Sequence, residues 1–186
     1  VTRHFDSSWD MYDRHLYPGG AFRLHMLRCL LGEDDFWAGV RTYVDRYQHQ
    51  VVEPADFRRC LEESSGRSLA RFFDQWIYSP GYPKLKLSYS HNAERGEASF
   101  TLQQTQVDAK KGIPVFDFDL EFAIEQSEGQ WIHKTLAVSG EHSSLTVALK
   151  EAPLQVVIDP KFAVLHRLDF HPGDEMLARS VSSEQN

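Results

Sequence analysis

A chain of 186 residues with 41% hydrophobic and 25% charged residues has the length and composition of an ordinary globular protein of one or two domains. Its formal net charge of −7 argues against a general binder of nucleic acid or anionic membranes, because neutralising phosphates requires a basic surface. No apolar run approaches the roughly 18 residues needed to span a bilayer. We therefore expect neither nucleic acid nor a membrane as a partner.

The first eighty residues carry apolar side chains at the three- and four-residue steps that are typical of helices. Capping and breaking residues divide this region into about four helices. The boundary signals are Pro18 at an entry, a left-handed stop at Gly32, an acidic start at Glu33–Asp35, a start at Pro54, a stop before Gly66, and a cap at Ser68. We therefore predict an N-terminal α-helical part.

Two groups of residues are expected inside this helical part. The tryptophans Trp9, Trp37 and Trp76 are interpreted as core residues. Cys29 and Cys60 fall within apolar helical patterns, which favours buried free thiols over a disulfide and hence a reducing compartment. The sequence also lacks Asn-x-Ser/Thr acceptor sites, and we predict a cytoplasmic location.

The pattern changes near position 80, where "SPGYP" (79–83) ends the helical part because its two prolines cannot continue a helix. The period then becomes two, and about seven short strands alternate with polar turns. This spacing predicts a seven-stranded antiparallel β-sandwich over 81–171. The stretch 172–186 is interpreted as a linker or the truncated start of a following helical domain. Four acidic residues share one side of a strand, most simply its solvent face: Asp117, Asp119, Glu121 and Glu125.

The motifs of self-sufficient enzymes are absent from the sequence. No His-Glu-x-x-His, Cys-x-x-Cys, Gly-x-Ser-x-Gly, P-loop or Gly-x-Gly-x-x-Gly occurs. The nine histidines are interpreted as surface or packing residues. We expect these 186 residues to supply no metal ligand and no cofactor site.

Tyr17 is the candidate catalytic residue, at the start of "YPGGAFRLHMLR" (17–28). Proline is favoured at the first helical position and pushes the preceding residue toward an extended conformation, so Tyr17 is expected at a helix entrance. There a neutral phenol can donate a hydrogen bond to a developing oxyanion, and the positive end of the helix dipole favours the same charge. In the alternative interpretation Tyr17 is a hydrophobic staple whose hydroxyl bonds to backbone. Asp13, Arg14 and His15 form either a polar network that orients Tyr17 or a salt-bridged surface turn.

Two long stretches, "SSWDMYDRHLYPGGAFRLHMLRCLLGEDDFWAGVRTYV" and "VEPADFRRCLEESSGRSLARFFDQWIYSPGYPKLKLSYS", resemble the aminopeptidase N-like zinc metallopeptidases. They are similar to the part of the catalytic domain that follows the zinc motif. In that family a tyrosine opening a Tyr-Glu-Lys-Gly-Ala segment stabilises the tetrahedral intermediate. Tyr17, Gly20 and Ala21 match this segment, whereas Pro18 and Gly19 replace the usual Glu and Lys or Arg. "FTLQQTQ" and "VVIDPKFAVLHRLDF" resemble the family's following small β-sandwich.

The resemblance implies a fragment of a zinc-dependent aminopeptidase that hydrolyses N-terminal residues from peptides. Residues 1–80 would be the C-terminal helical part of the catalytic domain, 81–171 the β-sandwich, and 172–186 the linker or helical start. It implies peptide substrates and zinc in the parent protein, an upstream zinc-binding domain and a downstream helical domain. The fragment alone would bind no zinc and be inactive. Two alternatives stay open: a non-catalytic scaffold derived from the same fold, and an unrelated helical domain fused to an immunoglobulin-like sandwich.

Overall fold

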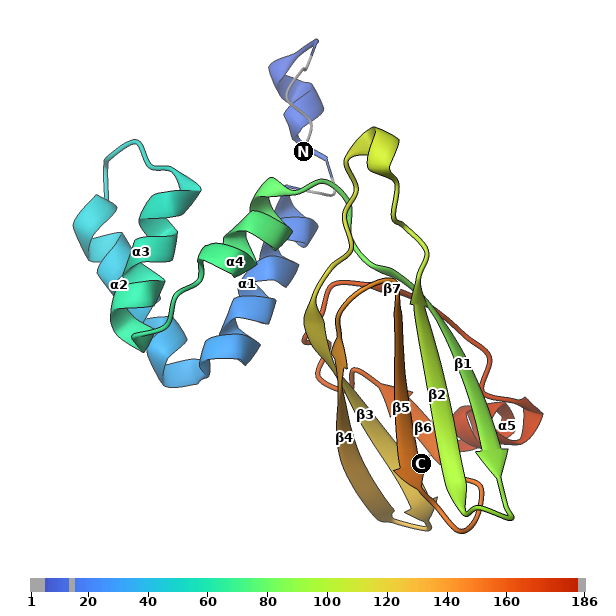
Figure 1. The fold of residues 1–186 in the computed structure, drawn as a ribbon. Coiled ribbons are helices and arrows are strands. Elements are labelled where there is room, and N and C mark those ends of the chain that lie inside the picture. Colours follow the sequence, from blue (N-terminus) through green and yellow to red (C-terminus); the bar gives the residue numbers. More distant parts are fainter. Residues whose placement is uncertain (1–5, 14–15, 184–186) are drawn as a thin grey trace. The chain divides into compact units, whose positions relative to one another are not determined.

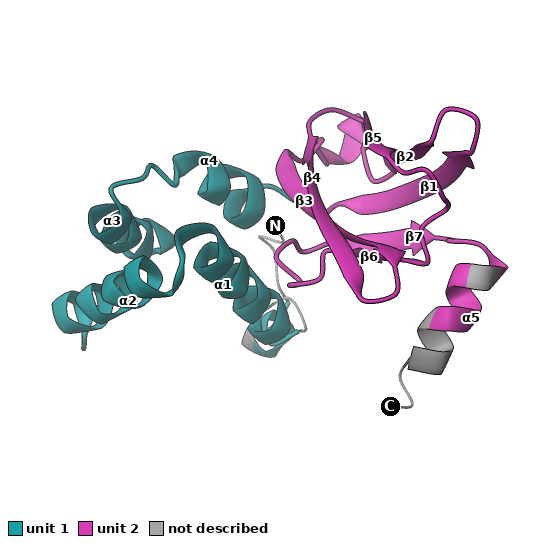
Figure 2. Ribbon diagram, turned by 90° about the horizontal axis from the view of Figure 1, so that it is seen from below, with its two compact units in different colours: residues 1–80 teal, residues 81–186 magenta. Residues whose placement is uncertain are grey.

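Helices come first and strands second in this α+β chain. The computed structural model describes residues 6–13 and 16–183, which divide into two compact units, residues 1–80 and 81–186 (Figures 1 and 2). The described part of unit 1 holds only helical elements, whereas unit 2 is built on two sheets of four and three strands. The predicted change from helices to sheets near residue 80 is thus confirmed.

Unit 1 contains short and long helical elements in the order 3₁₀-helix η1 (Ser8–Met11), α1 (Tyr17–Leu31), α2 (Glu33–Tyr47), α3 (Pro54–Ser65), α4 (Ala70–Phe73) and the π-helical turn η2 (Asp74–Tyr78). The acidic start of α2 and the proline start of α3 are as predicted. Gly66 ends α3 in the left-handed conformation, with φ 65° and ψ 11°, which glycine adopts without steric cost.

Two predicted helix boundaries are wrong in detail. Gly32 has φ 86° and ψ 164°, which is not left-handed helical, because it must both end α1 and begin α2 within one residue. Ser68 does not cap the fourth helix. Its place is taken by Leu69, whose N–H donates to Oε1 of Glu62 at 2.7 Å, so that a carboxylate of α3 satisfies the backbone before α4.

The core of unit 1 gathers side chains from four of its helices and from the residue before α4, namely Leu27, Leu31, Phe36, Leu61, Leu69 and Phe73. Trp76 is buried as predicted, but Trp9 and Trp37 are 78% and 44% exposed. Trp9 lies in the short η1, and Trp37 follows the buried Phe36 by one position, which turns its side chain away from the core.

The described part of unit 2 contains strands and two short helices in the order β1 (Lys84–Asn92), β2 (Glu97–Gln104), the 3₁₀-helix η3 (Ala109–Lys111), β3 (Phe118–Ser127), β4 (Gln130–Val138), β5 (His142–Ala148), β6 (Gln155–Ile158), β7 (Arg167–Phe170) and α5 (Asp174–Ser183). One sheet has the strand order β5-β2-β1-β7 and the other β4-β3-β6. The register pairs Leu87 with Leu102 in the first sheet and Phe122 with Ile158 in the second.

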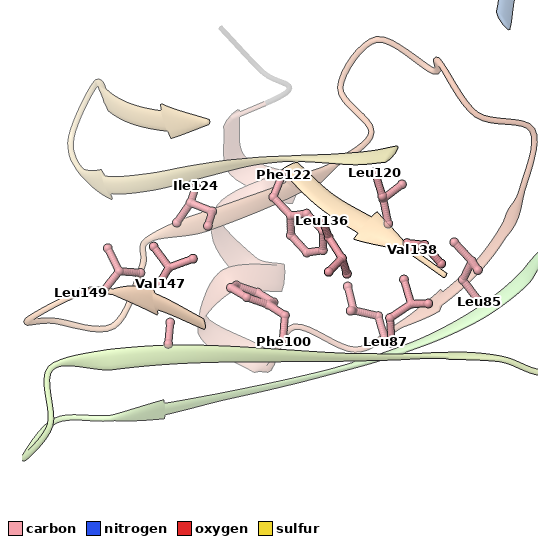
Figure 3. Close-up of a cluster of buried hydrophobic side chains, with 12 residues drawn as sticks. Leu85, Leu87, Phe100, Leu120, Phe122, Ile124, Leu136, Val138, Val147 and Leu149 are labelled. Carbon is pink, nitrogen blue, oxygen red and sulfur yellow. The ribbon is translucent and has the colours of Figure 1, made fainter. Parts of the chain in front are cut away.

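Apolar side chains from both sheets form a single core in unit 2 (Figure 3). The rings of Phe100 on β2 and Phe122 on β3 lie with their centroids 5.2 Å apart. Strand alternation explains this core, because every second residue of each strand points to the same face. Alternating residues within 85–87, 100–102 and 120–124 supply most of its members.

Two expectations for unit 2 are wrong. β7 pairs with β1 in parallel, so the sheets are antiparallel except at this pair. Glu125 is only 5% exposed and does not lie on a solvent face; α5 covers it, and Arg179 of α5 contacts its carboxylate. The stretch predicted as a linker or helical start contains α5. In the described part of the chain, no helix is long and apolar enough to cross a membrane.

Candidate functional site at the start of helix α1

Tyr17 is the first residue of α1, and Pro18 is the second. The sequence predicted Tyr17 just outside the helix, with Pro18 in the first position. The difference arises because the N–H of Leu16 bonds to both the carbonyl and the Oδ1 of Asp13, each at 3.2 Å. This turn already gives Leu16 helical angles of φ −69° and ψ −67°, and α1 continues from it. A proline in the first turn costs no hydrogen bond, since that N–H has no helical partner.

The Tyr17 side chain is 69% exposed. Its ring lies 6.4 Å from the ring of Tyr12, which in turn lies 5.8 Å from the ring of Trp9. None of the described residues forms a hydrogen bond with the Tyr17 hydroxyl. The phenol therefore lies at an accessible helix N-terminus within a short row of aromatic rings.

The electrostatics of this helix end favour an anion. The first turn of α1 contains no acidic residue, whereas the first turn of α2 contains three. The positive end of the α1 dipole is therefore not neutralised by a carboxylate of its own first turn. A negative charge that develops beside Tyr17 would meet both the phenol and this helix end.

Arg23 is the residue of this site that sequence reasoning missed. Its Nη1 donates to the carbonyl of Gly19 at 2.9 Å, and its Nε donates to the carbonyl of Trp76 in η2. Partial burial lowers the pKa of Arg23 from its ordinary value. The available signal was an arginine four residues after a glycine, one turn along the same helix face.

The polar residues before Tyr17 are only partly described. Asp13 accepts the N–H of Leu16 and so belongs to the turn that begins α1. Arg14 and His15 lie outside the described residues. The choice between a polar network and a surface turn therefore stays a prediction.

An apolar groove of about 580 Å³ opens between α1 and α2. Its lining includes the exposed side chains of Leu24, Trp37 and Val44, of which Trp37 was expected in the core. Its polar lining includes His25 and Arg28 of α1. The groove offers an apolar contact surface and no acid–base pair.

The cysteines are both free, and only one is buried as predicted. Cys60 is 0% exposed, and burial raises the pKa of its thiol. Cys29 is exposed, with its Sγ 3.5 Å from Nε2 of His25. It lies two positions from Leu27 and Leu31, which places it on the opposite side of α1 from the core.

The residues present do not fit a zinc ion. Among residues 6–13 and 16–183, no group of three or more His, Cys, Asp or Glu side chains is arranged to hold a metal. A protein zinc site needs at least three such ligands.

The comparisons with known proteins agree with the helical architecture. Residues 2–76 match the model of the peptidase family M1 domain. This part of the chain is thus similar to the peptidase M1 domain, in agreement with the resemblance of its sequence to the aminopeptidase N-like metallopeptidases.

Individual relatives extend this match. Aminopeptidase N of Lactococcus lactis subsp. lactis is 33% identical over 81 residues, which is 43% of this chain and 10% of the relative. Aminopeptidase A of Gloydius brevicauda is 26% identical over 142 residues, or 76% of this chain and 15% of the relative. The chain therefore spans between a tenth and a sixth of the length of these two relatives.

A solved structure shares the fold. The crystal structure of Legionella pneumophila aminopeptidase A in complex with aspartic acid superposes with a TM-score of 0.69 at 17% identity. The match covers 90% of this chain and 19% of that one. Both the helical unit and the two-sheet unit thus fall within the matched fold.

Proposed function

We propose that these 186 residues are part of a zinc-dependent aminopeptidase that hydrolyses N-terminal residues from peptides. The observation that carries the proposal is the match of residues 2–76 to the peptidase M1 domain, with Tyr17 accessible at the start of α1. In this proposal residues 1–80 are the C-terminal helical part of the catalytic domain, and 81–171 form a β-sandwich. Residues 172–186 begin the connection to a further helical domain.

Tyr17 is the group that this chain supplies to the reaction. When water adds to the scissile carbonyl, the carbonyl oxygen gains negative charge, and the phenol donates a hydrogen bond to it. The donor strengthens as the charge develops, so it stabilises the transition state more than the bound substrate. The N-terminus of α1, whose first turn contains no acidic residue, adds a favourable field at the same place.

The zinc ligands lie outside residues 1–186 in this proposal, since the described residues offer no metal site. The purified 186-residue chain is therefore expected to bind no zinc tightly and to hydrolyse nothing. Stoichiometric zinc together with peptidase activity in this chain would contradict the proposal. A cytoplasmic location also remains our proposal, supported by the free thiols.

Tyr17→Phe in the full-length protein tests the role of Tyr17. We expect kcat on aminoacyl-amide substrates to fall by about 10²- to 10³-fold, as for other single oxyanion donors. Tyr78→Phe is the matched control, because it removes an exposed phenol hydroxyl elsewhere in unit 1. We expect this control to keep the parent's kcat.

The same assay distinguishes the scaffold alternative. A full-length protein that stays inactive on the whole substrate panel with zinc supplied would favour the scaffold. An active protein whose kcat is unchanged by Tyr17→Phe would keep the aminopeptidase and remove Tyr17 from the mechanism.

A further inference from the structure

Burial, side-chain capping and helix propensity contribute little to the stability of the N-terminal half of α1. Its buried side chains are Met26, Leu27 and Leu31, so none of residues 17–25 is fully buried. Leu16 precedes the helix and has no side-chain oxygen with which to cap it. Gly19 and Gly20 lack side chains, and glycine favours a helix less than alanine does. A Cβ on Gly20 would touch nothing within 4 Å.

Arg23 connects this half of the helix to η2, the last helical turn of unit 1 in the sequence. One of its nitrogens holds the carbonyl of Gly19, two residues after Tyr17, while its Nε holds the carbonyl of Trp76. Trp76 is 4% exposed and packs in the body of unit 1. The guanidinium is planar and rigid, so two bonds from it fix the orientation of one backbone segment relative to the other.

The Trp76 carbonyl lies close to the end of the helical part of unit 1. Trp76 lies in the π-helical turn η2, and an α-helical bond from the residue four positions ahead is excluded because that residue, Pro80, has no N–H. The chain also leaves the helical conformation at Ser79, where ψ is 146°. At this helix end, Arg23 donates to the Trp76 carbonyl.

We propose that Arg23 is a positioning residue that holds the first turn of α1, and with it Tyr17, in the orientation needed for the reaction. The inference rests on the proposed function of Tyr17. It adds that this orientation is set by a bond to η2, the last helical turn of unit 1 in the sequence.

The test measures kcat and KM of the full-length protein with Arg23→Gln, Arg23→Lys, Tyr17→Phe and the double variant Tyr17→Phe/Arg23→Gln. A misplacement of about 1 Å can cost up to about 10²-fold, so we expect Arg23→Gln to lower kcat by roughly 10- to 100-fold. KM should change little, because the lost interaction matters mainly in the transition state. Lysine keeps one of the two bonds, and we expect an intermediate kcat.

Arg67→Gln is the matched control. Arg67 also donates to a backbone carbonyl of α1, that of Leu30 at 2.7 Å, but at the opposite end of the helix from Tyr17. A purely structural role would give the two glutamine variants similar losses of kcat and of thermal stability. Of these two variants, we expect only Arg23→Gln to lose kcat, together with faster amide hydrogen exchange in the N-terminal half of α1.

The double variant decides whether Arg23 acts through Tyr17. Once the phenol hydroxyl is gone, loss of its positioning should cost nothing more, so the double variant should match Tyr17→Phe. Losses that multiply, or an Arg23→Gln enzyme as active as Arg67→Gln, would overturn the positioning role while Tyr17→Phe still supports the proposed function. An unchanged kcat in Tyr17→Phe would instead overturn both.

Discussion

Gly39 of α2 lies so close to Leu61 of α3 that no side chain fits between the two helices at this point. A Cβ on Gly39 would lie 2.7 Å from Cδ2 of Leu61 and 3.0 Å from its Cα. The first distance could be relieved by a rotation of the leucine, but Leu61 is fully buried and its backbone is fixed in α3. The absence of a side chain at Gly39 therefore sets how closely the two helices approach.

Gly39→Ala should destabilise unit 1. Overpacking costs about 1–3 kcal/mol, which exceeds the gain of about 1 kcal/mol in helix propensity. Gly20→Ala is the control, because a methyl group there meets nothing within 4 Å and should stabilise α1 by about 0.5–1 kcal/mol. Denaturant unfolding of both variants checks the opposite signs. Equal destabilisation by the two substitutions would show that the contact with Leu61 is not the cause.

The two thiols should differ in reactivity. Cys29 is exposed, whereas Cys60 is fully buried and its pKa is raised by burial, which lowers its thiolate fraction at neutral pH. A disulfide reagent such as Ellman's should therefore label Cys29 rapidly and Cys60 only after unfolding. Cys29→Ser should abolish the fast phase. A fast phase that survives this substitution would place Cys60 at an accessible position.

Glu63 of α3 should make the stability of unit 1 depend on pH. Arg46 of α2 donates to both of its carboxylate oxygens, at 2.9 and 2.8 Å, and this hydrogen bonding lowers the pKa of Glu63 below its ordinary 4.5. A carboxyl with a depressed pKa stabilises the fold above the unfolded-state value and loses this contribution as pH falls through the folded-state value.

Glu63→Gln should accordingly lower the unfolding midpoint at pH 7, and its difference from the parent should shrink below pH 4.5. The effect should be small, because both side chains are half exposed. In an Arg46→Gln background the same substitution should have almost no effect at any pH. A difference that grows on acidification would contradict the assigned sign.

Glu125 should hold α5 against unit 2. Its Oε1 accepts the N–H of Gly129 at 2.9 Å, and its Oε2 lies 3.4 Å from Nε of Arg179. Glu125→Ala leaves the Gly129 N–H without this acceptor, and we expect a loss of about 1–3 kcal/mol. Hydrogen exchange in α5 should accelerate. Glu128→Ala, at an exposed position in the same turn, should change neither quantity.

Much of the local structure was predictable because it follows from short-range chemistry. Pro54 and Gly66 bound α3, and the acidic run after Gly32 begins α2, since caps and dipoles act within one turn. Strand alternation likewise accounts for the inward positions of Phe100 and Phe122.

The incorrect predictions concern features that depend on contacts with segments distant in the sequence. Ser68 does not cap α4, because Leu69 takes the N-cap position and its N–H bonds to Glu62 of α3. Glu125 is buried rather than exposed, and Arg179 of α5 contacts its carboxylate. The parallel pairing of β7 with β1 depends on chain topology, which a strand pattern does not encode. In the candidate site, Tyr17 could be found from its own short segment. Arg23 could not be assigned a role, because its partner Trp76 lies 53 residues away.

The position of β7 has a consequence for biosynthesis. β7 covers the edge of β1, so the four-stranded sheet is completed only when Arg167–Phe170 is present. While the chain emerges from the ribosome, β1 leaves its hydrogen-bonding groups on that side unpaired until this late strand appears. Such an open edge invites pairing with another nascent chain. A chain truncated before residue 167 would therefore be prone to aggregate, because the edge of β1 would stay unpaired.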